Sequence, residues 1–149
     1  MRPPIVYVDT SAVKNGKLGE LEVGMKRLAA FVEINVPQVI SYGFFLNEDR
    51  TQMTVVAVHR DSASLEFHMD VGAAEFPKFA NLIDLVRIDV YGLVSDAVRE
   101  RLYQKAEMLG IGTVTIHEFY AGSRAKENGT GGSRSDAAMM HSRSTFSAV

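Results

Sequence analysis

The chain has 149 residues, of which 46% are hydrophobic and 23% are charged, and this composition is typical of one soluble globular domain. It contains no cysteine, which excludes disulfide frameworks, iron–sulfur clusters, cysteine-ligated zinc and thiol nucleophiles. The 16 basic and 18 acidic residues give a net charge of -2, so no basic excess points to a nucleic acid or an anionic membrane as a partner.

The N-terminal apolar run is too short for a signal peptide or a membrane span, and we expect a cytoplasmic protein. Residues 1–120 show regular hydrophobic periodicity and are predicted to form one domain. Residues 121–149 are rich in Ser, Gly and Arg and bury too little to offset the entropy of ordering, which predicts a flexible C-terminal tail. Alternatively, the tail is ordered on a partner chain through Met139, Met140 and Phe146.

The first half of the domain is predicted to contain a strand at 4–10, a helix at 17–34 and two strands at 39–46 and 53–60, the last two joined by the polar loop 47–52. The helix is indicated by an apolar stripe at helical spacing: Leu18, Leu21, Met25, Leu28, Ala29 and Val32. Alternation in the first strand of the pair places four side chains on one face: Ile40, Tyr42, Phe44 and Leu46.

Two helical segments follow the second of these strands. Asp61 or Ser62 caps the first segment, and Gly72 interrupts it. A second short helical piece spans 73–80, with Pro77 suited to its first turn.

The last predicted elements are a strand at 85–93, a helix that begins at Ser95 and ends at Gly110, and a strand at 113–120. The strand at 85–93 alternates two sets of side chains: Val86, Ile88 and Val90 against Arg87, Asp89 and Tyr91.

The predicted order is β-α-β-β-α-β followed by α-β. Its first six elements make the ferredoxin-like split βαβ arrangement, an α+β fold with helices on one face of an antiparallel sheet. Strands 39–46, 53–60 and 85–93 are nevertheless apolar, or nearly so, on both faces. A second copy of the chain is the simplest cover for the open face, which predicts a homodimer. The alternative is that the last helix and strand fold back over that face.

The chain resembles the antibiotic biosynthesis monooxygenase-like domains of the dimeric α+β barrel superfamily over residues 4–124. The segments that carry the likeness are NGK at 15–17, PQVISY at 37–42, RDSASLEFH at 60–68, YGLVSD at 91–96 and AGSR at 121–124. The resemblance implies a dimer whose two sheets form a barrel, with a small pocket between helices and sheet in each half. Members of the family include cofactor-free oxygenases of quinols, anthrones and polycyclic phenols, and others degrade haem.

His68 matches the histidine position of that family and is our candidate catalytic base. Oxygenation without a cofactor needs a base, oxyanion donors and a dry apolar pocket, and a histidine accepts a proton near neutral pH. The alternative is a packed or surface histidine without chemistry. The chain has no tryptophan, and its first strand offers no asparagine, so haem degradation is disfavoured while haem binding through His68 stays open.

Polar residues on two strands are candidates for binding a substrate oxygen. Tyr42 and either Arg87 or Tyr91 are the candidate donors, with Asp89 orienting Arg87. The alternatives are a core tyrosine at 42 and, for the second group, an ion pair between subunits or solvation of an edge strand.

Aromatic side chains gather around the second helical region. We expect Phe67, Phe76 and Phe79, with Phe44, to form a pocket wall for a planar ligand, the alternative being an ordinary core. The histidines show no paired metal-ligand spacing, so neither a metal nor another cofactor is predicted.

These features favour a cofactor-independent monooxygenase acting on a small aromatic or quinol substrate. The alternative is a non-catalytic dimeric module that binds a small ligand or has a structural or regulatory role. A sealed pocket that contains His68 and a second polar side chain supports the enzyme, whereas a filled core with His68 exposed supports the module.

Overall fold

A computed structural model describes residues 2–123. The elements are β1 (Ile5–Val13), α1 (Leu18–Asn35), β2 (Val39–Leu46), β3 (Gln52–His59), α2 (Ser62–Gly72), the 3₁₀ helix η1 (Phe76–Phe79), β4 (Ile83–Tyr91), α3 (Asp96–Leu109) and β5 (Gly110–His117). The predicted order is therefore confirmed. Most of the predicted tail lies outside the described residues, as do Met139, Met140 and Phe146.

The five strands form one mixed sheet in the order β2-β3-β1-β4-β5. Its first three pairings are antiparallel, and β4 pairs with β5 in parallel because α3 carries the chain back between them. The central strand β1 lies between β3 and β4, as the split βαβ arrangement requires. The predicted α+β ferredoxin-like fold, extended by a helix and a strand, is confirmed.

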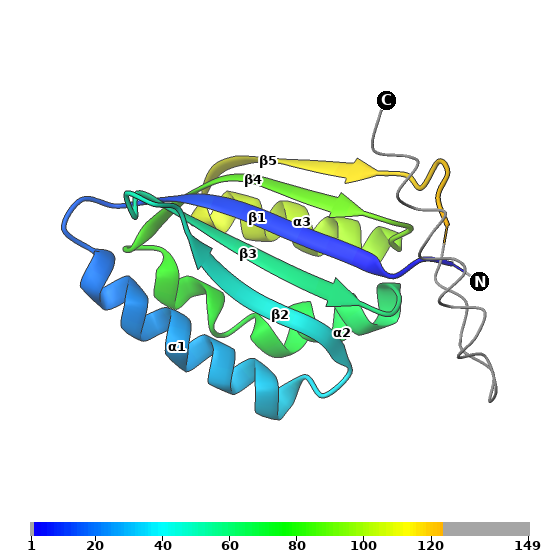
Figure 1. The fold of residues 1–149 in the computed structure, drawn as a ribbon, viewed down its shortest axis with the longest axis horizontal. Helices are drawn as coiled ribbons and strands as arrows, with labels where there is room; N and C mark the ends of the chain where they lie inside the picture. The colour runs from blue at the N-terminus through cyan, green and yellow to red at the C-terminus, as the bar shows by residue number, and fades with distance from the viewer. Residues whose placement is uncertain (1, 124–149) are drawn as a thin grey trace, which may run out of the picture.

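The helices lie on one side of the sheet, so the domain has two layers (Figure 1). The helix α3 packs beneath β4 and β5, beside α2 and η1, and β5 extends the edge of the sheet. The suggestion that the last helix and strand fold back over the open face is therefore wrong. That face is left without cover by any described part of the chain.

Local signals set the ends of α2 and α3. The Asp61 side chain accepts a hydrogen bond from the Ser64 amide at 2.9 Å, and the Ser95 hydroxyl accepts one from the Val98 amide at 3.2 Å. At the end of α3, a Cβ on Gly110 would lie 2.8 Å from the backbone of Leu85, so only glycine allows β5 to approach β4 this closely.

Register decides which side chains face the helices. Alternate residues of β1, from Ile5 to Asp9, point inward and pair with inward residues of β3, from His59 to Val55. A bulge in the pairing of β1 with β4 breaks the alternation, so that Leu85 is buried while Val86 is 44% exposed. The expectation that Val86 shares a face with Ile88 and Val90 is therefore wrong.

A second bulge lies at the start of β2, between Val39 and Ser41. It leaves Ile40 exposed, whereas Tyr42, Phe44 and Leu46 pack against the core. The prediction for this strand is therefore wrong at Ile40 alone.

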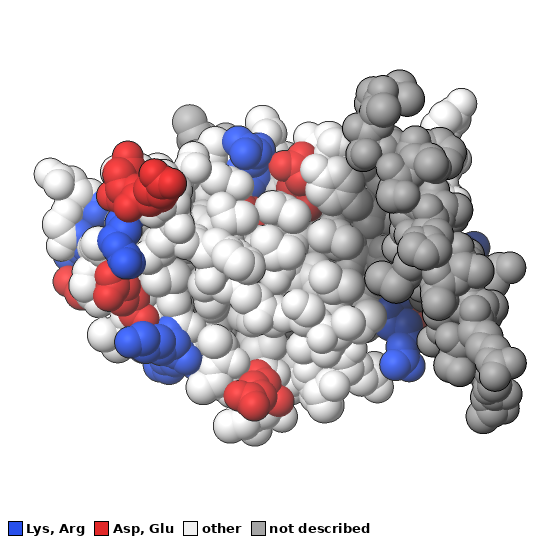
Figure 2. All heavy atoms as spheres, viewed as in Figure 1, with Lys and Arg blue, Asp and Glu red and all other residues white. Residues whose placement is uncertain are grey.

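The opposite face of the sheet carries valines from β1 and β3. Val6 pairs with Val58 and Val8 with Val56, all directed away from the helices and only partly buried. Figure 2 shows this face as a broad uncharged surface with charged side chains at its margins. The predicted open apolar face is present.

Candidate functional site

A charged cluster lies inside the domain, between the sheet and α3. The Tyr7 hydroxyl donates to Asp9 Oδ2 at 2.5 Å, and Lys105 Nζ donates to Tyr7 Oη at 2.7 Å and to Asp9 Oδ2 at 3.1 Å. Tyr7 and Asp9 are two residues apart on the inward face of β1, and α3 brings Lys105 over them. All three are buried, and even the lysine is only 9% exposed.

Burying this ion pair is costly, and the contacts around it compensate both charges. The Lys105 ammonium lies 4.3 Å from the centroid of the Phe76 ring and 4.9 Å from that of Tyr7, in addition to its two hydrogen bonds. Burial, with the charge and hydrogen bond of Asp9, raises the pKa of Tyr7 well above its ordinary value. Tyr7 is therefore held protonated and acts as a donor.

Two neutral histidines lie beside this cluster. His59 Nδ1 is 2.9 Å from Ser64 Oγ, and the rings of His59 and His68 are 5.1 Å apart. Burial lowers the pKa of His59 to about 4, and burial with the nearby charges of His59 and Lys105 lowers the pKa of His68 to about 3. His59 Nε2 and His68 Nδ1 have no hydrogen-bond partner within residues 2–123.

Two small cavities adjoin these groups, of about 20 Å³ and about 10 Å³. The larger is lined by Asp9 and Ser11, and the smaller by Tyr7 and both histidines. The Ser11 hydroxyl also has no hydrogen-bond partner among the described residues. Both cavities share the same central lining: Tyr42, Val55, Phe76 and Lys105. Each has room for about one water molecule, so the interior is closely packed and polar at its centre.

Four of the predicted site residues meet in this interior. His68 is 6% exposed, its ring lies 5.1 Å from that of Tyr42, and Phe76 and Phe79 line the cavities. Burial, with the charge of Asp9, raises the pKa of Tyr42, so its hydroxyl stays protonated. Phe44, from the predicted aromatic wall, stacks on Phe79 with ring centroids 6.5 Å apart.

Three other predicted site residues lie elsewhere. Phe67 is 49% exposed, and neither cavity includes it. Arg87 and Tyr91 are on the open face of the sheet, where Arg87 Nε is 3.4 Å from Asp89 Oδ2. Asp89 also lies 2.9 Å from His117 Nε2, and the His117 ring stacks on Tyr91. These side chains form a separate polar group on the far side of the sheet.

Sequence analysis missed the charged cluster of Tyr7, Asp9 and Lys105, although two signals were present. Asp9 continues the buried alternation of Ile5 and Tyr7 along β1. Lys105 falls within the buried stripe of α3 at the spacing of Val98, Leu102 and Leu109. A charged residue in each of two buried stripes is the pattern expected of a buried pair, because neither charge is tolerated there alone.

A metal or haem site would need ligands or space in the interior formed by residues 2–123. Among residues 2–123 there is no group of three or more histidine, aspartate or glutamate side chains placed to hold a metal ion. The cavity beside His68 is about 10 Å³, which leaves no room for a porphyrin. Within the same described part of the chain, no helix is long and apolar enough to cross a bilayer.

Comparison with known proteins shows a likeness of fold. No family model and no curated protein matches the chain. MupZ from Pseudomonas fluorescens is similar in structure, with a TM-score of 0.65 and 17% identity over 84% of this chain and 91% of its own. A conserved protein from Methanosarcina mazei has a TM-score of 0.53 and 24% identity over 59% of this chain and 90% of its own.

A third similar structure is a "putative antibiotic biosynthesis monooxygenase" from Deinococcus radiodurans, with a TM-score of 0.49 and 12% identity over 84% of this chain and 99% of its own. Because that TM-score is below 0.5, the fold assignment rests on the first two. What these two structures show is a likeness of fold. It assigns neither a substrate nor an activity.

Proposed function

We propose that the protein is a cofactor-independent monooxygenase that acts on a small phenol or quinol between the sheet and the helices. The observation that carries this proposal is the buried Lys105 ammonium beside His68, whose ring nitrogen is neutral and unpartnered in the described chain. A fixed cation and a free acceptor in a water-poor interior are what deprotonation of a phenol requires. His68 is 6% exposed, which argues against a filled core that leaves His68 at the surface.

In the proposed reaction, His68 accepts the proton of the substrate and Lys105 stabilises the anion that forms. The pKa of His68 is low in the free protein, but the new negative charge raises it, because imidazolium and phenolate attract each other strongly in a low dielectric. The anion passes one electron to O₂, the substrate radical and superoxide combine to a peroxide anion, and the proton held by His68 converts that anion to a hydroperoxide. Loss of water leaves a ketone or quinone, so one oxygen atom enters the product and the other enters water.

Oxygen uptake with a panel of quinols and anthrones tests this function. His68→Ala is expected to lower the rate at least tenfold because it removes the proton acceptor. His117→Ala, a histidine change on the open face, is the matched control and should retain the wild-type rate. With ¹⁸O₂, one labelled atom is expected in the product. Equal rates for wild type and His68→Ala would remove the role of His68.

We also propose that two copies associate through the open face of the sheet. The uncharged surface around Val6, Val8, Val56 and Val58 supports this, because such a face on a monomer would expose a continuous apolar patch to water. Sedimentation equilibrium at micromolar concentration should give a mass twice that of the chain. A monomer at every concentration would contradict it.

A second candidate is a non-catalytic module that binds a small ligand. The size of the cavities favours it, since spaces of about 20 Å³ and about 10 Å³ hold no aromatic ring. The two candidates differ in the oxygen assay: the module consumes no oxygen with any quinol or anthrone of the panel.

A further inference from the structure

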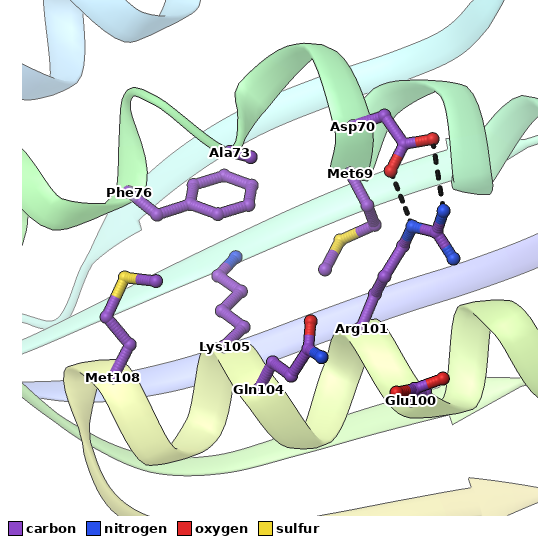
Figure 3. A pocket seen from close by; sticks show the side chains of 9 residues that line it. All are labelled: Met69, Asp70, Ala73, Phe76, Glu100, Arg101, Gln104, Lys105 and Met108. Atoms are coloured by element: carbon purple, nitrogen blue, oxygen red, sulfur yellow. Dashed lines mark hydrogen bonds and ion pairs between the residues drawn. The ribbon is translucent and has the colours of Figure 1, made fainter.

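A groove with a volume of about 400 Å³ lies between α2 and α3. Figure 3 shows its lining, with Met69 and Phe76 on the side of α2 and η1 and Lys105 facing them from α3. The volume falls in the range of roughly 300–1,000 Å³ usual for small-molecule sites, unlike the two internal cavities. The groove is thus a space of substrate size that adjoins the cavity beside His68.

Three side chains separate the groove from the interior. Met69, Phe76 and Lys105 line both the groove and the cavity beside His68. The Phe76 ring lies between Gly72, where an added Cβ would be 2.9 Å from it, and the Lys105 ammonium, 4.3 Å from its centroid. A ligand that passes from the groove to His68 has to displace only Phe76 or Met69, both of which are side chains without hydrogen bonds.

The charge on the groove selects against anions. Arg101 pairs with Asp70 through Nε and lies 3.5 Å from Glu66 through Nη2, so its charge is already compensated. These pairs and the hydrogen bonds of Asp70 raise the pKa of Arg101. Glu100 adds a further carboxylate to the lining. Lys105 is likewise paired with Asp9, so a phosphate or carboxylate would find no unpaired cation in this lining.

Apart from Lys105, whose charge is paired with Asp9, the remaining lining is uncharged and adaptable. It consists of the thioethers of Met69 and Met108, the Phe76 ring and the Gln104 amide. Methionine side chains adjust to irregular apolar ligands, and one amide supplies a single hydrogen-bonding group. This surface suits an apolar chain that carries at most one neutral polar group.

We propose that the groove between α2 and α3 is the entrance to the interior and binds the uncharged arm of an elongated substrate. The reacting end of that substrate displaces the Phe76 ring and reaches Lys105 and His68. The identity of the reacting end rests on the proposed function, whereas the groove as a binding site does not. The substrate class is thus a phenol or quinol with an uncharged side chain.

Methyl NMR of methionine tests the groove without any turnover. Hexylhydroquinone under nitrogen is the probe, and the methyl signals of Met69 and Met108 are expected to shift on titration while that of Met25, on α1, does not. Unchanged Met69 and Met108 signals at saturating probe overturn the inference, whichever other signals move.

Filling the groove tests its role in turnover. Met108→Trp is expected to raise the KM for hexylhydroquinone about tenfold and to raise the KM for unsubstituted hydroquinone by a smaller factor, because the short substrate passes through the groove without an arm that binds along it. Tyr103→Trp is the control, since Tyr103 lies on the same helix outside the groove and is equally exposed. Equal effects of both variants on the long and short substrates overturn the inference. If wild type consumes no oxygen with any quinol, the proposed function fails, and the NMR titration still decides the groove.

Discussion

The two faces of the sheet each carry a carboxylate–cation pair, but in opposite environments. On the inward face, the carboxylate of Asp9 is paired with Lys105 and shielded from solvent. On the open face, Asp89 is paired with Arg87 and His117, and about half of the arginine side chain is exposed. Each pair joins a carboxylate to a cation, yet only the inward pair lacks access to water. Burial, not the identity of the residues, makes the inward pair a candidate site.

The largest expected effect comes from breaking the inward pair. Lys105→Met leaves Asp9 as an uncompensated buried charge and is expected to lower the free energy of unfolding by about 3–5 kcal/mol in urea denaturation. The double variant Asp9→Leu/Lys105→Met should recover most of that loss. Arg87→Met, on the open face, is expected to cost less than about 1 kcal/mol because solvent screens its pair. Similar losses for Lys105→Met and Arg87→Met would contradict the comparison.

The second-largest expected effect is that acid destabilises the folded protein through the two buried histidines. The pKa values of His59 and His68 are lowered to about 4 and about 3, so below pH 6.5 the unfolded chain takes up protons that the folded chain does not. Between pH 6.5 and 5.0 the loss is at most about 2 kcal/mol for each histidine. Urea denaturation at several pH values measures it. His68→Leu should reduce the dependence of the free energy of unfolding on pH. An equal reduction by His117→Gln would show that the acid effect arises on the open face and not on the inward face.

The smallest expected effect concerns assembly through the open face. Val58→Lys places a charge in the centre of the proposed interface and should raise the dimer dissociation constant at least about tenfold, which is about 1.4 kcal/mol. Its effect on the oxygen-uptake site is indirect, because Val58 points away from the helices. Val23→Lys, at an exposed position on α1, is the control. Sedimentation velocity distinguishes them, and equal dissociation constants would locate the interface elsewhere.

Local patterns were sufficient to predict the elements and half of the candidate site. Helical and strand periodicity predicted the positions that bring His68, Tyr42, Phe76 and Phe79 to the core. Alternation also grouped Arg87 with Tyr91 correctly. It could not tell which face the helices cover, because alternation defines two faces and not their surroundings.

Long-range geometry was beyond the sequence patterns. Lys105 and Asp9 are 96 positions apart, and no local rule joins them. The exposure of Val86 and Ile40 depends on bulges, which shift register through backbone pairing and leave no clear mark in the residues themselves. The site could therefore be located by its aromatic and histidine members but not by its charges.

The position of Lys105 on α3 gives the C-terminal extension a part in folding. A fragment that stops at residue 95 would contain every strand and helix of the basic split βαβ unit, yet Asp9 would lie within it without a cation. Lys105 on α3 therefore neutralises a charge that the split βαβ unit leaves unpaired. We expect the interior of a chain still emerging from the ribosome to close only after α3 has docked. The helix α3, which is added after the split βαβ unit, thus supplies the cation that pairs with Asp9.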